Sequence, residues 1–429
     1  MDQNTIKCLR PILIGWILLL GLWGCTSDVR QSASIDVLVG AAPEETLTVV
    51  QPSDLAIDPR LVETQTQFGL NLFAAILQVE GDQNILISPV SVAIALSMVY
   101  NGADGDTQQA IAQTLALPSL SPEAVNAAIA SLSNTLATPD PEVRVDIANS
   151  LWVRQGFSLY PAFVEQVPEF YTAEATNLDF GNPSAPGIIN AWVAEKTEGK
   201  ISQMVNQISP DQVLFVINAV YFKGNWTNAF DPERTTEQPF HLLNGSTKPH
   251  LQMSQEDQYL YYETDQFQAV SLPYGDGGLS LYVFLPKQHS SLADFQSSLS
   301  AEAWSDWMTQ FGRRPGAIKL PRFQFEYETG LKPILETLGM GIAFDPTRAN
   351  FAKLSPDSTF ISQVQHKTFI EVNEEGTEAA GSTSIGMTVT SVSPEPEPAF
   401  EMIVDQPFFI AIRDNSTGAI LFMGAIVEP

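Results

Sequence analysis

The spacing of apolar residues predicts helices in the first third of the chain. Phe68, Leu72 and Ile76 recur every four residues, which is typical of an amphipathic helix with one buried face. Residues 90–99 are apolar nearly all round, so a second helix there should be buried on every side. The Ser-Pro pair before this run is favoured at a helix start, because Ser can cap and Pro tolerates the first helical position. By the same signals, further helices should begin near Asp106 and Ser121.

Short apolar runs typical of β-strands dominate the second half. The last two of them flank the polar segment Asp414–Gly418 and predict a hairpin. Because helices concentrate in the first half and strands in the second, the pattern indicates an α+β arrangement rather than alternating βαβ units. The runs expected as strands are 85–87, 143–153, 213–222, 279–285, 318–327, 368–372, 408–412 and 420–427.

The N-terminal 24 residues have the pattern of a targeting segment. Lys7 and Arg10 give a positive start, and the apolar run 12–23 follows. A membrane-spanning helix needs about 20 residues, so this run is short for a span and suits the core of a signal peptide. An ordinary secretion signal and a short membrane anchor remain the alternatives.

The stretch Leu22-Trp23-Gly24-Cys25 resembles the lipobox of bacterial lipoproteins, in which the cysteine is acylated and becomes the new N-terminus. Trp23 departs from that pattern, since a small residue is usual there. Ser27 follows two residues after the cysteine, which resembles sorting signals for export beyond the inner membrane. We therefore expect Cys25 to be the lipid attachment site. The protein should be exported and lipid-anchored at the cell envelope (periplasm, outer membrane or cell surface).

The chain has 429 residues, a length that at about 150 residues per domain suggests two or three domains. Residues 25–58 are rich in Ser, Thr, Asp, Gln, Pro and Ala, and indicate a flexible tether. No further shift in composition follows. The pattern therefore divides the chain into a signal peptide (1–24), a tether (25–58) and one globular unit (59–429).

Charge and cysteine content exclude several classes of protein. The net charge is −28, from 21 basic and 49 acidic residues, with no basic stripe, so a nucleic-acid partner is excluded. With 44% apolar and 10% aromatic residues, the chain is not disordered throughout. The two cysteines, Cys8 and Cys25, both lie in the first 25 residues. The body of the protein therefore has no disulfide, cysteine zinc site or cysteine nucleophile.

The sequence offers no catalytic constellation. None of the four histidines has a ligand partner at helical spacing, which argues against a metal site. Nucleophile elbows, phosphate loops and dinucleotide-binding glycine patterns are missing too. Among 49 carboxylates, acidic pairs such as Glu374-Glu375 arise by chance. We expect the protein to be no enzyme and to need no cofactor.

One segment differs from the rest of the chain. Eleven of the fifteen residues 376–390 are Gly, Ala, Ser or Thr, and no charge follows Glu378. A flexible surface linker is one interpretation. The other is a strand that slides between two existing strands, because a charge or a large ring facing the core there would cost several kcal/mol. In that case Thr377, Ala379, Gly381, Thr383 and Ile385 would face the core, and the proline- and glutamate-rich run 394–398 would be an extended stop.

Residues 371–380 resemble the hinge signature of the serpins: Glu-Val-Asn-Glu-Glu-Gly-Thr-Glu-Ala-Ala. Segments 84–91, 218–226 and 320–323 resemble further serpin motifs, as does the closing stretch 405–424. Each is weak alone, but all five occur in family order, and the resemblance covers about residues 60–429. The chain is therefore identified as a member of the serpin family, with an inhibitory hinge and a bacterial lipoprotein-type leader.

The resemblance implies a serpin fold of three β-sheets and about nine helices, with an exposed reactive-centre loop at about 376–398. It also implies an inhibitor of serine proteases that acts as a suicide substrate. A target cleaves the loop and forms an acyl-enzyme, and the loop then inserts into the main sheet and traps the target. The native state would be held kinetically above a more stable inserted form.

Residue roles follow from the same resemblance. Thr377 matches the first hinge residue to enter the sheet, and Gly376 gives the backbone its freedom. Trp226 matches a tryptophan of the breach, the place where insertion begins, although simple core packing is the better explanation for it. For His366 a satisfied core histidine is compatible with its matched role. The hinge comprises Glu374, Gly376, Thr377, Glu378, Ala379, Ala380 and Gly381, and the shutter, a polar cluster beneath the parting strands, comprises Ser88, Ser91, Asn218 and His366.

Counting from the hinge places the reactive bond between Thr390 and Ser391, with Val389–Thr390 as the neighbouring choice. Counting back from Pro407 gives a different answer, because that section is about six residues longer than the family norm. A small β-branched residue before the bond suits elastase-like or subtilisin-like proteases, and a cysteine protease is a further possibility. Residues 368–412 contain no Arg or Lys, which disfavours trypsin-like targets.

Residues 101–118 carry no stripe of Lys or Arg, so we expect no glycosaminoglycan activator. The expected protein is a monomer whose partners are a protease and, through its lipid, a membrane. The alternative is a non-inhibitory serpin that serves as a protease substrate or binding module. Non-inhibitory members often carry bulky or charged hinge residues, and the small residues of this hinge favour the inhibitor.

Overall fold

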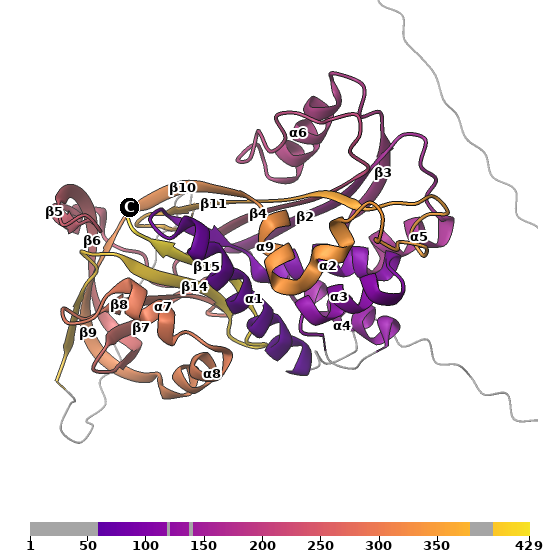
Figure 1. Ribbon diagram of the computed structural model, residues 1–429. Coiled ribbons are helices and arrows are strands. Elements are labelled where there is room, and N and C mark those ends of the chain that lie inside the picture. Colours follow the sequence, from indigo (N-terminus) through magenta and orange to yellow (C-terminus); the bar gives the residue numbers. More distant parts are fainter. Residues whose placement is uncertain (1–58, 118–120, 137–139, 378–397) are drawn as a thin grey trace, which may run out of the picture. The chain divides into compact units, whose positions relative to one another are not determined.

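The computed structural model describes residues 59–117, 121–136, 140–377 and 398–429. Within these ranges, nine α-helices and two hydrogen-bonded sheets form an α+β fold (Figure 1). The helices are α1 (Pro59–Glu80), α2 (Pro89–Gly102), α3 (Gly105–Thr114), α4 (Pro122–Leu136), α5 (Pro161–Tyr171), α6 (Ala185–Lys196), α7 (Leu292–Ser298), α8 (Ala301–Gln310) and α9 (Lys332–Leu335).

The smaller sheet contains the feature on which function depends. Its central strands β11 and β4 run parallel and pair directly from Ile361 and Leu214 to Phe369 and Tyr221. Beyond that point they separate around a two-residue strand, β12, which is antiparallel to both. We call this place the fork. In spatial order the strands are β10 (Phe323–Gly330), β11 (Ile361–Val372), β12 (Gly376–Thr377), β4 (Leu214–Asn225), β2 (Val143–Arg154) and β3 (Glu174–Leu178).

The larger sheet bends because β6, with 17 residues, belongs to two parts of it. The first residues of β6 pair with β5, its middle pairs with β9, and its end pairs with β7. Two of the three expected sheets are thus continuous through β6. Besides β5 (Thr236–His241) and β6 (Thr247–Glu263), the strands are β1 (Ile85–Ile87), β15 (Ile420–Ile426), β14 (Phe408–Asp414), β8 (Leu279–Pro286), β7 (Phe267–Tyr274), β9 (Gly312–Pro321) and β13 (Phe400–Ile403).

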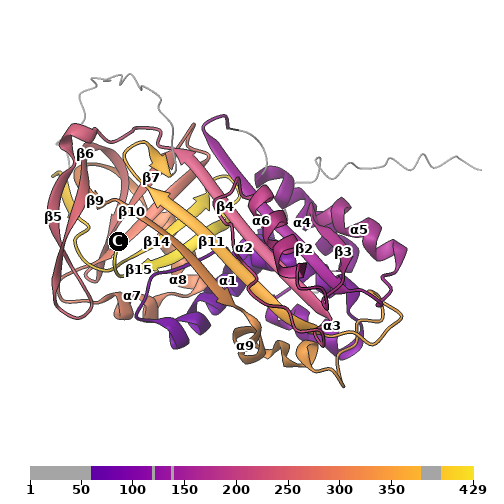
Figure 2. The same ribbon diagram turned by 90° about the horizontal axis from the view of Figure 1, so that it is seen from above.

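Helix α2 lies between the two sheets, which explains its all-round apolar sequence. Every residue of α2 except Asn101 is buried, as the sequence predicted. Helix α1 crosses it closely, because a Cβ at Gly69 would lie 2.6 Å from the Pro89 side chain. Helix α6 covers the opposite face of the smaller sheet, over β4 and β2 (Figure 2). The smaller sheet therefore has helices on both faces.

Two local predictions were wrong. Residues 318–327 form no single strand: the chain breaks at Arg322, so that β9 belongs to the larger sheet and β10 to the smaller. Ser88 occupies the N-cap position of α2, but its side chain makes no capping hydrogen bond. Its backbone N–H instead donates to Nε2 of His366, 3.1 Å away in β11.

Candidate functional site

The fork holds the first residues of the small-residue segment. Thr377 pairs with Val372 of β11 on one side and with Gly224 of β4 on the other. Its side chain is wholly buried, and its hydroxyl lies 2.6 Å from the hydroxyl of Tyr274. Thr377 thus faces the core, as expected for a residue that begins a new central strand.

Glycine on both sides of the fork permits this close approach. A Cβ at Gly376 would lie 2.1 Å from the carbonyl oxygen of Gly224. A Cβ at Gly224 would lie 3.0 Å from the rings of Phe222 and Tyr274. The backbone at Gly376 could not sit where it does with a larger residue, and a side chain at Gly224 would press on the two rings, so both glycines favour the entry of β12 between β11 and β4.

Trp226 ties the segment before β12 to the end of β4. Its indole stacks on Tyr274 with ring centroids 4.5 Å apart. The indole N–H donates to the carbonyl oxygen of Asn373 at 2.9 Å, and its backbone N–H donates to that of Glu375 at 2.9 Å. Trp226 therefore packs in the core and also binds the chain that leads into the fork.

An ion pair lies beside the fork. The Glu374 side chain is only 5% exposed. Its carboxylate accepts hydrogen bonds from the guanidinium of Arg322, whose Nε lies 2.7 Å from Oε1. The hydroxyl of Thr235 donates to the same carboxylate. A buried carboxylate needs such partners, since an unpaired buried charge is costly. Arg322, at the break between β9 and β10, thereby holds the hinge against the smaller sheet.

A chain of buried hydrogen bonds crosses the β11–β4 seam. The Nδ1 atom of His366 lies 2.5 Å from Oδ1 of Asn218, its register partner, and Nε2 accepts from the backbone of Ser88. The Ser91 hydroxyl donates to the same Asn218 oxygen at 2.9 Å. Asn218 in turn donates to Oδ1 of Asn149 in β2 at 2.6 Å. The four expected shutter residues are thus brought together.

The protonation state of His366 follows from this surrounding. Burial lowers the pKa of His366 to about 3, so the ring is neutral at physiological pH. Because Nε2 accepts a hydrogen bond, the single proton lies on Nδ1 and is donated to Asn218. The seam is therefore closed by neutral hydrogen bonds, which can break and form again without moving a charge.

Four residues of the site were missed or given no role from the sequence. Asn149 could have been found as the polar position of β2 opposite Asn218. Arg322 lay within a recognised motif, but nothing local links it to Glu374. Tyr274 and Thr235 carried no signal, because only the three-dimensional fold brings them to the hinge.

Several expected site residues lie outside the described residues. They include the rest of the hinge, both choices for the reactive bond and the lipid attachment site. They are Cys25, Glu378, Ala379, Ala380, Gly381, Val389, Thr390 and Ser391.

Within the described ranges, no group of three or more His, Cys, Asp or Glu residues could hold a metal ion. In the same part of the chain, no helix has the length and apolar character to cross a membrane. What the site offers instead is a place for a strand: a parallel seam that is parted at one end, with Gly376 and Thr377 between its two strands.

Comparisons with known proteins agree with this geometry. Residues 63–429 match the family model described as "Serpin (serine protease inhibitor)". An uncharacterized serpin-like protein of Thermococcus kodakarensis is 32% identical over 428 residues, which cover 98% of this chain and 99% of that protein. Plasminogen activator inhibitor 1 of Sus scrofa is 32% identical over 374 residues, covering 85% and 91%. The crystal structure of tengpin, a thermophilic serpin in its native state, superposes with a TM-score of 0.80 at 30% identity, covering 88% and 96%.

Proposed function

Because this chain belongs to the serpin family, we propose that it inhibits serine proteases by a loop that is cleaved and then inserted at the fork. Serpins are protease inhibitors rather than enzymes, and this chain is accordingly not an enzyme.

The observation that carries the mechanism is the position of β12. Gly376 and Thr377 already occupy the gap between β11 and β4, antiparallel to both. Each further residue that follows them would pair on two sides, while the direct β11–β4 pairing opens in front. Residues 378–390 suit this path past the buried Asn218 and His366, since most of them are small and none after Glu378 is charged.

The proposed target class rests on residues before the reactive bond. With Thr390 before the bond and Val389 as the neighbouring choice, both options are small and β-branched. Such residues fit the shallow primary pockets of elastase-like and subtilisin-like serine proteases, and of some cysteine proteases. Residues 368–412 contain no Arg or Lys, so trypsin-like targets are not proposed.

A protease panel tests this function. Incubation of the full chain with an elastase or a subtilisin should give a covalent complex that survives SDS, together with a released C-terminal fragment. Mass spectrometry of that fragment should place its first residue at Ser391 or Thr390. Clean cleavage across the panel with no stable complex would instead support the alternative, a non-inhibitory serpin that acts as a substrate or binding module.

We also propose that Cys25 anchors the protein to the cell envelope through a lipid. Support comes from the lipobox-like residues 22–25 and from the absence of any other cysteine after Cys8. Cys25→Ser should release the protein from the membrane fraction, while Cys8→Ser, a matched control within the leader, should leave the mature protein in place. Unchanged membrane retention of the Cys25 variant would contradict acylation.

A further inference from the structure

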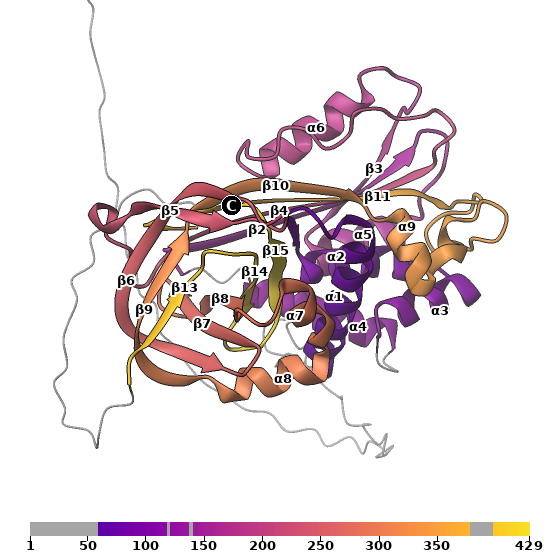
Figure 3. The same cartoon turned by 60° about the vertical axis from the view of Figure 1, so that its left-hand side comes forward.

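The turn between β5 and β6 carries an Asn-Gly pair, Asn244-Gly245, on an open surface. Residues 243–247 are all exposed, and a Cβ at Gly245 would meet no atom within 4 Å. Among the described strands β5 pairs only with β6, and it lies at the margin of the fold (Figure 3). Water therefore has free access to both residues of the pair.

The backbone of this turn has the hydrogen bonds of a three-residue hairpin loop with a glycine bulge. The Gly245 N–H donates to the carbonyl oxygen of Leu242 at 2.9 Å, and the Leu242 N–H donates to that of Ser246 at 2.8 Å. Gly245 has a φ of +81°, a conformation that favours glycine. The turn thus requires a residue without a side chain, and that residue leaves its own backbone nitrogen unshielded.

The Asn244 side chain is held against this backbone. Its Oδ1 accepts hydrogen bonds from the N–H of Ser246 at 2.9 Å and from the Ser246 hydroxyl at 2.6 Å. Because these donors lie two residues further on, the carboxamide folds back over the peptide nitrogen of Gly245. Two donors on one carbonyl oxygen also stabilise the negative charge that forms on that oxygen when a nucleophile adds to its carbon.

We propose that Asn244-Gly245 is a site of spontaneous deamidation, with Ser246 as its positioning residue. The Gly245 nitrogen loses its proton to solvent and forms a bond to Cγ of Asn244, while an electron pair of the carbonyl group moves to Oδ1. When this pair returns, the bond from Cγ to Nδ2 breaks. Nδ2 takes up a proton from water and leaves as ammonia, and the product is a five-membered succinimide.

Water then opens the succinimide ring. Addition at Cγ gives aspartate at position 244, whereas addition at the backbone carbonyl carbon gives isoaspartate, in which the main chain runs through Cβ and Cγ. The whole reaction consumes one water and releases one ammonia, so it needs no other reactant. Either product adds a negative charge to the turn.

Isoaspartate lengthens the main chain inside a loop of fixed length. The two hydrogen bonds that close the loop, from Leu242 to Ser246 and from Gly245 to Leu242, cannot both keep their geometry when an atom is added between them. Strand β5 has no second partner among the described strands, so nothing else holds this end of the hairpin. The modification therefore loosens the end of the β5–β6 hairpin.

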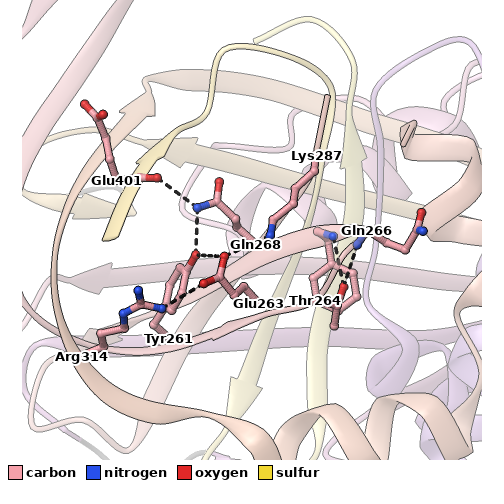
Figure 4. A network of polar contacts seen from close by, with 9 residues as sticks. Tyr261, Glu263, Thr264, Gln266, Gln268, Lys287, Arg314 and Glu401 are labelled. Carbon is pink, nitrogen blue, oxygen red and sulfur yellow. Dashed lines mark hydrogen bonds and ion pairs between the residues drawn. The ribbon is translucent and has the colours of Figure 1, made fainter. Parts of the chain in front are cut away.

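The other end of β6 is held by polar side chains, which confines the change to the hairpin. Near the β6–β7 turn, Glu263 contacts Lys287 at 3.0 Å and Arg314 at 3.0 Å (Figure 4). The Thr264 hydroxyl accepts a hydrogen bond from the backbone N–H of Gln266 at 3.0 Å. The β6–β7 turn is thus an internal reference for the β5–β6 turn.

The second Asn-Gly pair of the chain, Asn101-Gly102, is an internal control. It ends helix α2, and a Cβ at the buried Gly102 would lie 2.7 Å from the Leu354 side chain. The Asn101 amide nitrogen donates to the carbonyl oxygen of Ser97 at 3.0 Å and to Oδ1 of Asn126 at 2.7 Å. The Asn101 carboxamide therefore cannot turn toward Gly102 unless the helix end unfolds.

The test follows both pairs in the full chain, kept in mildly alkaline buffer with and without guanidinium chloride. Mass spectrometry of peptides measures the loss of each amide, and an isoaspartyl methyltransferase is the second probe. In the native protein Asn244 should react within about tenfold of its rate in the denatured chain, because an exposed turn opens at little cost. Native Asn101 should react at least about a thousandfold more slowly than in the denatured chain, since it requires unfolding.

Two variants test the role of Ser246. Ser246→Ala removes the hydroxyl donor, so the native protein should deamidate about fivefold more slowly, the factor for one neutral hydrogen bond. Ser246→Thr keeps the hydroxyl and should react at the wild-type rate. In guanidinium chloride the three proteins should not differ, because the turn no longer holds the carboxamide. Equal or faster reaction of native Ser246→Ala would overturn the role of Ser246, and a native Asn244 as inert as Asn101 would overturn the site.

Aged protein should also show the change in the hairpin. We expect the amide hydrogen of Leu242 to exchange about tenfold faster once position 244 is isoaspartate, whereas the amide of Gln266 keeps its rate. Unchanged exchange at Leu242 would contradict the loosened hairpin. None of these measurements uses a protease, so their outcome is independent of the proposed function.

Discussion

The side-chain hydroxyls of Tyr274 and Thr377 lie 2.6 Å apart, and neither residue has any exposed surface. Tyr274 ends β7 of the larger sheet, whereas Thr377 belongs to β12 of the smaller one. Burial raises the pKa of Tyr274, so its phenol stays protonated and able to donate at physiological pH. One hydrogen bond thus joins the two sheets through the first inserted side chain of the hinge.

Tyr274→Phe should loosen β12 without disturbing the stack on Trp226. The phenyl ring keeps its place, but the buried Thr377 hydroxyl loses its partner, which costs about 1–3 kcal/mol. We expect amide hydrogens at Gly376 and Thr377 to exchange about tenfold faster or more, because 1.4 kcal/mol is a factor of ten. Amides in the middle of β4 are the internal control. Unchanged exchange at the fork would show that the hydroxyl pair does not hold it.

Thr377→Arg should convert the inhibitor into a substrate. The residue faces the core between β11 and β4, and a guanidinium there would have to be buried without a partner. We expect loop cleavage at the wild-type rate, with the covalent complex reduced by about tenfold or more. Thr377→Ser, which keeps the hydroxyl and the small size, is the matched control. Equal complex formation by the arginine variant would contradict insertion of Thr377.

Arg322→Ala should destabilise the native protein through the charge that it leaves behind. The Glu374 side chain is 5% exposed and would keep only neutral donors, which costs about 3 kcal/mol. We expect the guanidinium chloride concentration at the midpoint of the first unfolding transition to fall clearly. Arg234→Ala is a suitable control, because it breaks an exposed ion pair with Glu256 that contributes less than about 1 kcal/mol. Similar shifts in the two variants would mean that the hinge pair behaves as a surface pair.

His366 should make stability depend on pH in a defined window. The native pKa is about 3, against about 6.5 in the unfolded chain, so the unfolded state binds an extra proton between these values. Stability is therefore full above pH 6.5 and declines as the pH falls toward 3. Between pH 7 and pH 5 the loss is about 2 kcal/mol. The unfolding free energy of His366→Gln should lack this slope, and parallel slopes in both proteins would contradict the assignment.

Local patterns were enough to predict the buried helix and to single out the small-residue segment. The periodicity of residues 90–99 predicted α2, because a helix between two sheets has to be apolar on every side. The small residues from Gly376 onward allowed either a surface linker or a strand able to enter a sheet, and the structure buries Thr377, the last described residue of this part, between two strands. Both features depend on the nature of the residues themselves rather than on distant partners.

Features that depend on distant partners were not predicted. The apolar run 318–327 crosses from one sheet to the other at Arg322, and each half is apolar for a different core. Strand β6 is largely polar and escaped notice, because its pairing with β5, β7 and β9 rather than its composition makes it a strand. Tyr274 reaches the hinge only because β7 ends there. Pairing between strands far apart in the sequence produces no pattern within a short stretch of residues.

The parallel pairing of β11 with β4 also limits how often a molecule can act. A strand that enters between them replaces one ladder of hydrogen bonds by two, and its alternate side chains leave water for the core. No contact made by an inserted strand favours its departure from between β11 and β4, so insertion is irreversible. Under the proposed mechanism, each copy of the chain is therefore spent on a single protease molecule. The number of protease molecules that could be inhibited is then set by the number of copies of this chain and not by a turnover rate.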